Sequence, residues 1–171
     1  VKKTDMFGEP LLVFQPWIAC IIAILLALVI AFIIGIPVLK LKGHYLAMAT
    51  LGFGIIIYRI ALASSIFGEA DGISEVPGFT LLPGVEISGG FGSRISNYYI
   101  AWTMVLLSMV LFINLINSRV GRALRAIHGA EDAANAMGVN TSRYKLKTFV
   151  LSAGLAALAG VFLTHYNGGI G

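Results

Sequence analysis

SRVGRALRAIHGAEDAANAMG, residues 118–138, is the segment that decides the fold, because it is charged and amphipathic and lies between two long apolar runs. Its first half has the period of a helix, since Val120, Leu124 and Ile127 are spaced at i, i+4 and i+7. The opposite face carries three basic residues, Arg119, Arg122 and Arg125. The sequence therefore predicts a surface helix whose basic face meets solvent or lipid headgroups.

A second short helix is predicted after Gly129, from about residue 130 to residue 137. Its apolar stripe consists mainly of small side chains, Ala130, Ala133, Ala134 and Met137. Glu131 and Asp132 lie in the first turn, where the helix dipole favours negative charge, and Gly138 is expected to end the helix in the left-handed conformation. Because alanines let another surface approach the backbone closely, the stripe is predicted to be a contact surface.

These segments resemble those of a known family. RALRAI at residues 122–127, FVLSAGLAALAG at residues 149–160 and GHYLAMATLGFG at residues 43–54 are similar to the inner-membrane permeases of ABC importers. More specifically, the chain resembles the M-type permease subunit of branched-chain amino acid importers. The resemblance extends over roughly residues 40–165.

The resemblance implies a multi-pass protein of the bacterial inner membrane that moves leucine, isoleucine, valine or related small polar substrates. It also implies cytoplasmic ATP-binding subunits, a second permease subunit and a periplasmic substrate-binding protein as partners. ATP would be bound by the partner, so no cofactor is expected in this chain. The segment that would couple to the ATPase contains Ala130, Glu131, Ala133, Ala134, Met137 and Gly138.

The composition predicts a membrane protein independently of any family. Hydrophobic residues make up 58% of the 171 residues and charged residues 12%, and the mean hydropathy is +0.90. A soluble domain of this length could hardly bury so much apolar surface. Residues 1–171 are expected to form a single transmembrane permease domain. The sequence at the two ends suggests a fragment of a longer chain.

Four apolar runs are long enough to cross a bilayer. The first has 23 residues without a charge. At ~1.5 Å per residue it extends about 34 Å, against a hydrocarbon core of ~30 Å. The four predicted spans are residues 17–39, 44–63, 98–116 and 148–166. The predicted fold is all-α, a polytopic transmembrane helical bundle with about four membrane helices and a short cytoplasmic coupling helix.

The charges of the connections predict the orientation. Residues 117–147 carry six basic and two acidic residues, net +4, whereas residues 64–97 carry four acidic residues and one arginine, net −3. The positive-inside rule makes the first a cytoplasmic coupling loop and the second an extracytoplasmic loop. Within the second, FTLLPGVEI at residues 79–87 predicts a short hairpin.

Small residues inside the spans leave alternatives open. Thr50, Gly52 and Gly54 in the second span are candidates for the translocation path, where transporters unwind helices, or for close helix packing. Gly35 and Pro37 indicate a kink or the end of the first span. A seam for helix packing is predicted in the fourth span, at Ser152, Ala156, Gly160 and Thr164.

The absence of other motifs narrows the function. The sequence has no phosphate-binding loop, no nucleophile next to a base and no spaced set of metal ligands, so we predict neither an enzyme nor catalytic or metal-binding residues. An arginine-rich segment between two spans indicates headgroups and protein partners rather than nucleic acid. The alternative function is an ion-gradient-driven transporter or channel subunit, which needs polar groups at mid-membrane; Arg59 and His44 both lie near span ends. A structural scaffold is the third possibility.

Overall fold

The computed structural model describes residues 3–4, 10–11, 16–41, 44–64, 73–74, 76, 78–82 and 85–170. Within these residues four helices are long and apolar enough to cross a membrane, judged by length and composition. They are α1 (Pro16–Val38), α2 (His44–Ala63), α3 (Arg94–Asn117), which a short 3-10 turn at Phe91–Ser93 precedes, and α6 (Thr141–Asn167). The predicted all-α membrane bundle is confirmed.

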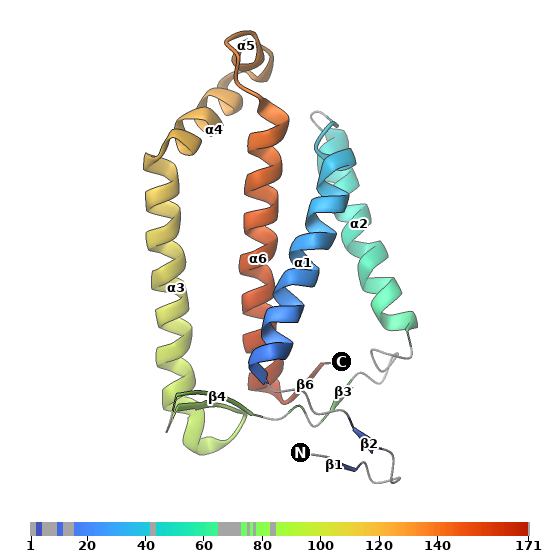
Figure 1. Cartoon of the computed structure of the whole chain (residues 1–171), viewed down its shortest axis with the longest axis vertical. Helices are drawn as coiled ribbons and strands as arrows, with labels where there is room; N and C mark the ends of the chain where they lie inside the picture. The colour runs from blue at the N-terminus through green and yellow to red at the C-terminus, as the bar shows by residue number, and fades with distance from the viewer. Residues whose placement is uncertain are drawn as a thin grey trace.

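Two short helices, α4 (Arg119–Gly129) and α5 (Glu131–Ala136), connect α3 to α6 at one end of the bundle (Figure 1). The β3, β4 and β6 strands lie at the opposite end (Figure 1). The chain runs from this end up α1, back down α2, up α3 and back down α6. The two connections that differ in charge therefore lie at opposite ends. Which end faces the cytoplasm stays a prediction.

Short antiparallel strand pairs accompany the bundle. They are β1 (Lys3–Thr4) with β2 (Pro10–Leu11), β3 (Ile73–Ser74) with β6 (Gly169–Ile170), and β4 (Phe79–Leu82) with β5 (Val85–Ile87). The third pair is the predicted hairpin, with Phe79 opposite Ile87; the residues of its turn, 83–84, lie outside the described residues. The β3–β6 pair ties the connection after α2 to the end of α6, which no sequence pattern predicted.

The largest helix–helix contact joins α1 and α6, which lie side by side in Figure 1. Ala31, Gly35 and Val38 of α1 are buried, at helical spacing on one face. A Cβ placed on Gly35 would lie 2.7 Å from Leu146 Cδ1, and one placed on Gly154 would lie 3.2 Å from Leu28 Cδ2. One glycine from each helix thus allows the two backbones to approach, as small residues do in membrane helices.

The seam predicted on α6 is not where α1 and α6 approach most closely. Ser152, Ala156 and Gly160 are exposed, and a Cβ on Gly160 would meet no atom within 4 Å. The contact runs instead through Gly154, because the larger Leu28 side chain needs the space that a glycine leaves. Four-residue spacing of small side chains marks a possible face of a helix, but the partner's side chains decide which face is used.

The ends of two spans also differ from the prediction. α3 begins at Arg94 rather than at residue 98, because its first turn is bonded to the hairpin: Asn97 Nδ2 donates to the Ser88 carbonyl at 2.8 Å. α6 begins at Thr141 rather than at residue 148, because Asn140 caps it by accepting a hydrogen bond from Arg143 N at 3.1 Å. Hydropathy marks where the bilayer begins, not where the helix does.

The α2 helix is continuous and has no buried residue. Gly52 and Gly54 lie within this continuous helix, and added Cβ atoms there would meet nothing within 4 Å. α1 likewise continues through Gly35 and Pro37 to Val38. Because none of its residues is buried, much of the α2 surface is available to lipid or to other helices.

Replacing Gly35 tests the α1–α6 contact. We expect Gly35→Leu to lower the free energy of unfolding in detergent by about 1–3 kcal/mol, as overpacking does. Leu146→Ala removes the nearest atom, so part of this loss should be recovered in the double variant. Thermal unfolding of the four proteins of this cycle measures the coupling; purely additive effects would show that the two residues do not touch.

Candidate functional site

The change of direction between α3 and α4 depends on Ser118 and Gly121. Ser118 Oγ accepts hydrogen bonds from Val120 N at 3.1 Å and Gly121 N at 3.4 Å, so it caps α4. A Cβ on Gly121 would overlap the backbone carbonyl of Ile116. Because backbone cannot move aside as a side chain can, only glycine fits where α4 bends away from α3 toward α6 (Figure 1).

The two faces of α4 are those that the sequence predicts. Ile127 is buried, and Val120 and Leu124 are half-buried. The basic residues of the opposite face are all exposed, namely Arg119, Arg122 and Arg125. α4 therefore lies with its apolar side toward the rest of the chain. That its basic side is cytoplasmic stays a prediction.

A left-handed glycine ends α5, as predicted. Gly138 has φ +83°. Its N–H donates to the Asn135 carbonyl at 3.0 Å, and Val139 N donates to the Ala134 carbonyl at 3.0 Å. This pair of bonds satisfies the last free carbonyls of the helix, and the φ value favours glycine.

Two side-chain interactions hold α5 against the start of α6. Lys145 Nζ lies 2.6 Å from Glu131 Oε1, in an ion pair whose side chains are 17% and 26% exposed. Thr141 Oγ1, on a buried residue, donates to Asn135 Oδ1 at 3.1 Å. Glu131 and Asn135 are four residues apart and so lie on one face of α5. That face is turned toward α6.

The alanine stripe of α5 is not one outward surface, which corrects the prediction. Ala134 is 5% exposed, whereas Met137 is 85% exposed. Ala130 and Ala133 are exposed as well. A helix of six residues that packs on both α4 and α6 has to bury one side, and the small Ala134 side chain permits this approach. Ala134 is therefore an internal packing residue, and the outward apolar surface is smaller and centred on Met137.

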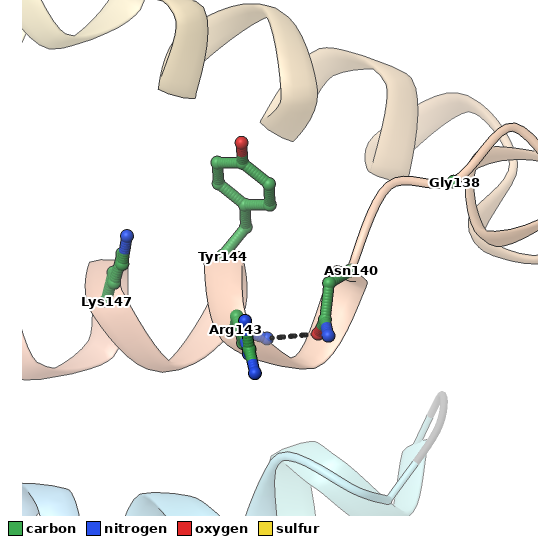
Figure 2. Close-up of a pocket in the computed structure, with 5 residues that line it drawn as sticks. All are labelled: Gly138, Asn140, Arg143, Tyr144 and Lys147. Atoms are coloured by element: carbon green, nitrogen blue, oxygen red, sulfur yellow. Dashed lines mark hydrogen bonds between the residues drawn. The ribbon is translucent and has the colours of Figure 1, made fainter.

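A polar cavity of about 250 Å³ lies beside the start of α6. Five residues line it: Gly138, Asn140, Arg143, Tyr144 and Lys147. Figure 2 shows Tyr144 extending toward the α4 ribbon and Arg143 toward the opposite side, where α1 ends and α2 begins. The sequence prediction counted Arg143 and Lys147 only as loop charges. Their four-residue spacing just before an apolar run was the available signal.

A larger cavity, of about 680 Å³, lies at the other end between α1 and α6. Small side chains from both helices line it, among them Ala19, Ala23, Ala27, Ala157 and Gly160. The expected path residues Thr50, Gly52 and Gly54 are on α2 and do not line it. Thr50 Oγ1 donates to the Ala47 carbonyl at 2.9 Å. The role of these three positions in a translocation path stays a prediction.

The four apolar helices define a polytopic α-helical membrane protein. Residues 4–170 match the profile of the family described as the permease component of branched-chain amino acid transport systems. The chain belongs to this family.

Three relatives illustrate the extent of the similarity. The high-affinity branched-chain amino acid transport system permease protein LivM of Escherichia coli K12 is 36% identical over 172 residues, covering 89% of this chain and 40% of that protein. The probable LivM permease of Methanocaldococcus jannaschii is 27% identical over 155 residues, covering 86% and 42%. The LivH permease of Salmonella typhimurium is 40% identical over 70 residues, covering 40% and 23%. No solved structure matches the chain significantly. The chain thus spans about 40% of the length of the LivM proteins that it matches.

Gly121 offers a test of the α3–α4 junction. Gly121→Ala should lower the midpoint of thermal unfolding and increase trypsin cleavage in α4, since the added Cβ collides with backbone. Gly129→Ala is the matched control, because nothing lies within 4 Å of a Cβ there and alanine is favoured over glycine in a helix. Equal behaviour of the two variants would contradict the role assigned to Gly121.

Proposed function

We propose that this chain is part of the permease subunit of an ATP-binding cassette importer in the bacterial inner membrane. Its proposed substrates are branched-chain amino acids, as the names of the LivM and LivH relatives indicate for those proteins. The individual candidates are leucine, isoleucine, valine or related small polar molecules. The observation that carries the proposal is a short helix, α5, fixed at one end of a membrane bundle by two specific bonds to α6.

The charges support placing α5 in the cytoplasm. Among the described residues, the bundle end that holds α4 and α5 carries Lys40 and the basic residues of α4 and α6 against two acids, Glu131 and Asp132. Such an excess of lysine and arginine is typical of cytoplasmic connections. The opposite end, with the β4–β5 hairpin, then faces the periplasm and a substrate-binding protein.

The surface of α5 is suited to receive a separate ATPase. Ala130, Ala133 and Met137 are exposed, and Met137 presents a flexible apolar side chain of the kind that fills irregular contacts. Glu131, Ala134 and Gly138 act as positioning residues, because they hold or end α5 without facing outward. ATP is bound and hydrolysed by the partner, and a second permease subunit completes the membrane unit.

The bonds between α5 and α6 provide a route for coupling. Ala130 alone separates α4 from α5, and the Glu131–Lys145 pair joins α5 to α6. A displacement of α5 by the ATPase is therefore transmitted to α3 through α4 and directly to α6. Since α6 is a single helix of 27 residues, its movement reaches the far side of the membrane. Alternating access then follows from tilting of the membrane helices.

The translocation path remains a proposal at Thr50, Gly52 and Gly54. α2 has no buried residue, so these small residues are free to line a path together with helices of a partner or of the remainder of a full-length subunit. The ion-gradient alternative gains no support. Within the described spans Arg59 lies near the end of α2 and His44 begins it, so neither lies at mid-membrane.

Met137 provides the test of docking. Met137→Asp should weaken binding of the ATPase by about 30-fold or more, the effect of losing a central contact, and lower transport and substrate-stimulated ATP hydrolysis together. Phe91→Asp is the matched control for the ATPase-binding measurement alone, because Phe91 is 84% exposed at the opposite end, which is proposed to face the substrate-binding protein. Reconstituted full-length permease with all partner subunits provides the measurement. Full coupled activity of Met137→Asp would exclude docking at this surface.

The Glu131–Lys145 pair provides a test of positioning. Glu131→Lys should destabilise the placement of α5, and Lys145→Glu in the same chain should restore it, with a coupling energy of about 1 kcal/mol for a partly buried pair. Lys147→Glu is the control partner, because Lys147 lines the cavity on another side of α6 and should not rescue Glu131→Lys. Thermal unfolding and coupled ATP hydrolysis are measured for each variant. If Lys147→Glu rescues Glu131→Lys as well as Lys145→Glu does, the effect comes from the overall charge and not from the Glu131–Lys145 pair.

A further inference from the structure

We propose that Phe79 of the β4–β5 hairpin acts as a wedge that holds α1 and α6 apart at the hairpin end and keeps the larger cavity between them open. The ring of Phe79 contacts one aromatic ring from each helix. Its centroid lies 4.9 Å from that of Trp17 on α1 and 5.3 Å from that of His165 on α6. Both distances are within the range of aromatic pairs, about 4.5–7 Å. One side chain from a separate element thus contacts the start of α1 and the end of α6.

The hairpin has a buried face and an exposed face. Phe79 and Ile87 are paired across it and are 6% and 2% exposed. The neighbouring pair, Thr80 and Glu86, is exposed. Successive side chains of a strand point to opposite faces, so Phe79 is held against the helices while the other face meets solvent. The Phe79 ring therefore leaves the two helices only when the hairpin itself moves.

The closest packing of α1 against α6 lies away from the hairpin. The buried residues of α1 are Ala31, Gly35 and Val38, all in its second half. The close approaches at Gly35 and Gly154 extend from the middle of the two helices toward α5. Nearer the hairpin, a Cβ added to Gly160 of α6 would meet no atom within 4 Å. Direct packing of one helix on the other therefore does not fix their separation at the hairpin end.

The larger cavity begins directly beside the wedge. His165 contacts the Phe79 ring and also lines the cavity. Small side chains form much of both walls, among them Ala19, Ala23 and Ala27 of α1 and Ala157 and Gly160 of α6. Surfaces of this kind let membrane helices pack closely. The two walls are therefore expected to meet when no larger side chain separates the helices, and Phe79 is the larger side chain at this position.

The wedge gives the hairpin a role in transport, a step that rests on the proposed function. The exposed face of the hairpin, with Thr80 and Glu86, lies at the end that is proposed to face the substrate-binding protein (Figure 1). A partner that displaces the hairpin displaces Phe79 with it, and the ends of α1 and α6 then close on each other. Binding outside the membrane thereby changes the opening between two membrane helices.

Disulfide formation across the cavity tests the wedge. Leu28 and Gly154 mark one level of the α1–α6 contact. Cys20 lies eight residues from this level along α1 and Val161 seven residues along α6, about 12 Å and 10 Å, and both line the cavity. The full-length permease carries Val161→Cys, and any cysteine outside residues 1–171 is replaced by serine. A disulfide needs Cα atoms within about 7 Å, so Phe79→Ala should accelerate its formation with copper phenanthroline at least about tenfold.

An equal rate with and without Phe79→Ala would overturn the wedge. Phe91→Ala is the matched control, because it removes the same kind of ring from an 84% exposed position, and it should change the rate by less than about twofold. Equal acceleration by Phe91→Ala would show general loosening and would also overturn the proposal. If Phe79→Ala does not fold, Phe79→Leu, which keeps an apolar but shorter side chain, should accelerate the reaction about threefold. An unchanged rate in that variant would contradict the wedge as well.

The link to transport has a separate measurement, with Phe79 intact. In the reconstituted importer that carries Val161→Cys, the substrate-binding protein loaded with leucine should accelerate the same disulfide at least about fivefold, the lower end of typical coupling between sites. An unchanged rate would overturn this step. An importer without substitutions that does not transport leucine would count against the proposed function, whereas the disulfide rates of the permease alone decide the wedge independently.

Discussion

The close approach of α1 and α6 at Gly35 and Gly154 supports the arrangement of the other elements. In a membrane, lipid is as apolar as the helices, so helices associate through packing and hydrogen bonds rather than through a hydrophobic driving force. Two glycines let Leu28 and Leu146 fit against the opposing backbones. α6 is thereby fixed to α1, and the elements at the two ends of the bundle contact α6. The hairpin and β6 lie at one end of it, and α5 and the polar cavity lie at the other.

The first turns of α6 have different environments on different sides. Lys145 pairs with Glu131 of α5, whereas Arg143 and Lys147 line the polar cavity. One side therefore meets the protein element that is proposed to receive the ATPase. A helix that begins outside the apolar run is needed for this arrangement, and the Asn140 cap provides that beginning.

Sequence patterns predicted the parts of this molecule that depend on local composition. The four spans follow from apolar runs, because a bilayer-crossing backbone has to satisfy its own hydrogen bonds as helix. The two faces of α4 follow from helical spacing, and the end of α5 follows from the glycine at position 138. The β4–β5 hairpin follows from a Pro-Gly pair between alternating residues. In each case the cause lies within a few residues.

Contacts between distant segments were decided by the tertiary structure alone. The burial of Ala134, the pairing of Glu131 with Lys145 and the use of Gly154 rather than Gly160 all depend on which side chain arrives from another helix. The same holds for the start of α3, where Asn97 donates a hydrogen bond to the carbonyl of Ser88, just after the hairpin. The sequence by itself therefore determined the membrane class, the helices and the glycine that ends α5, because these depend on solvent and local backbone chemistry. Which face of each helix is covered was decided only by folding, because that depends on the shape of the opposing surface.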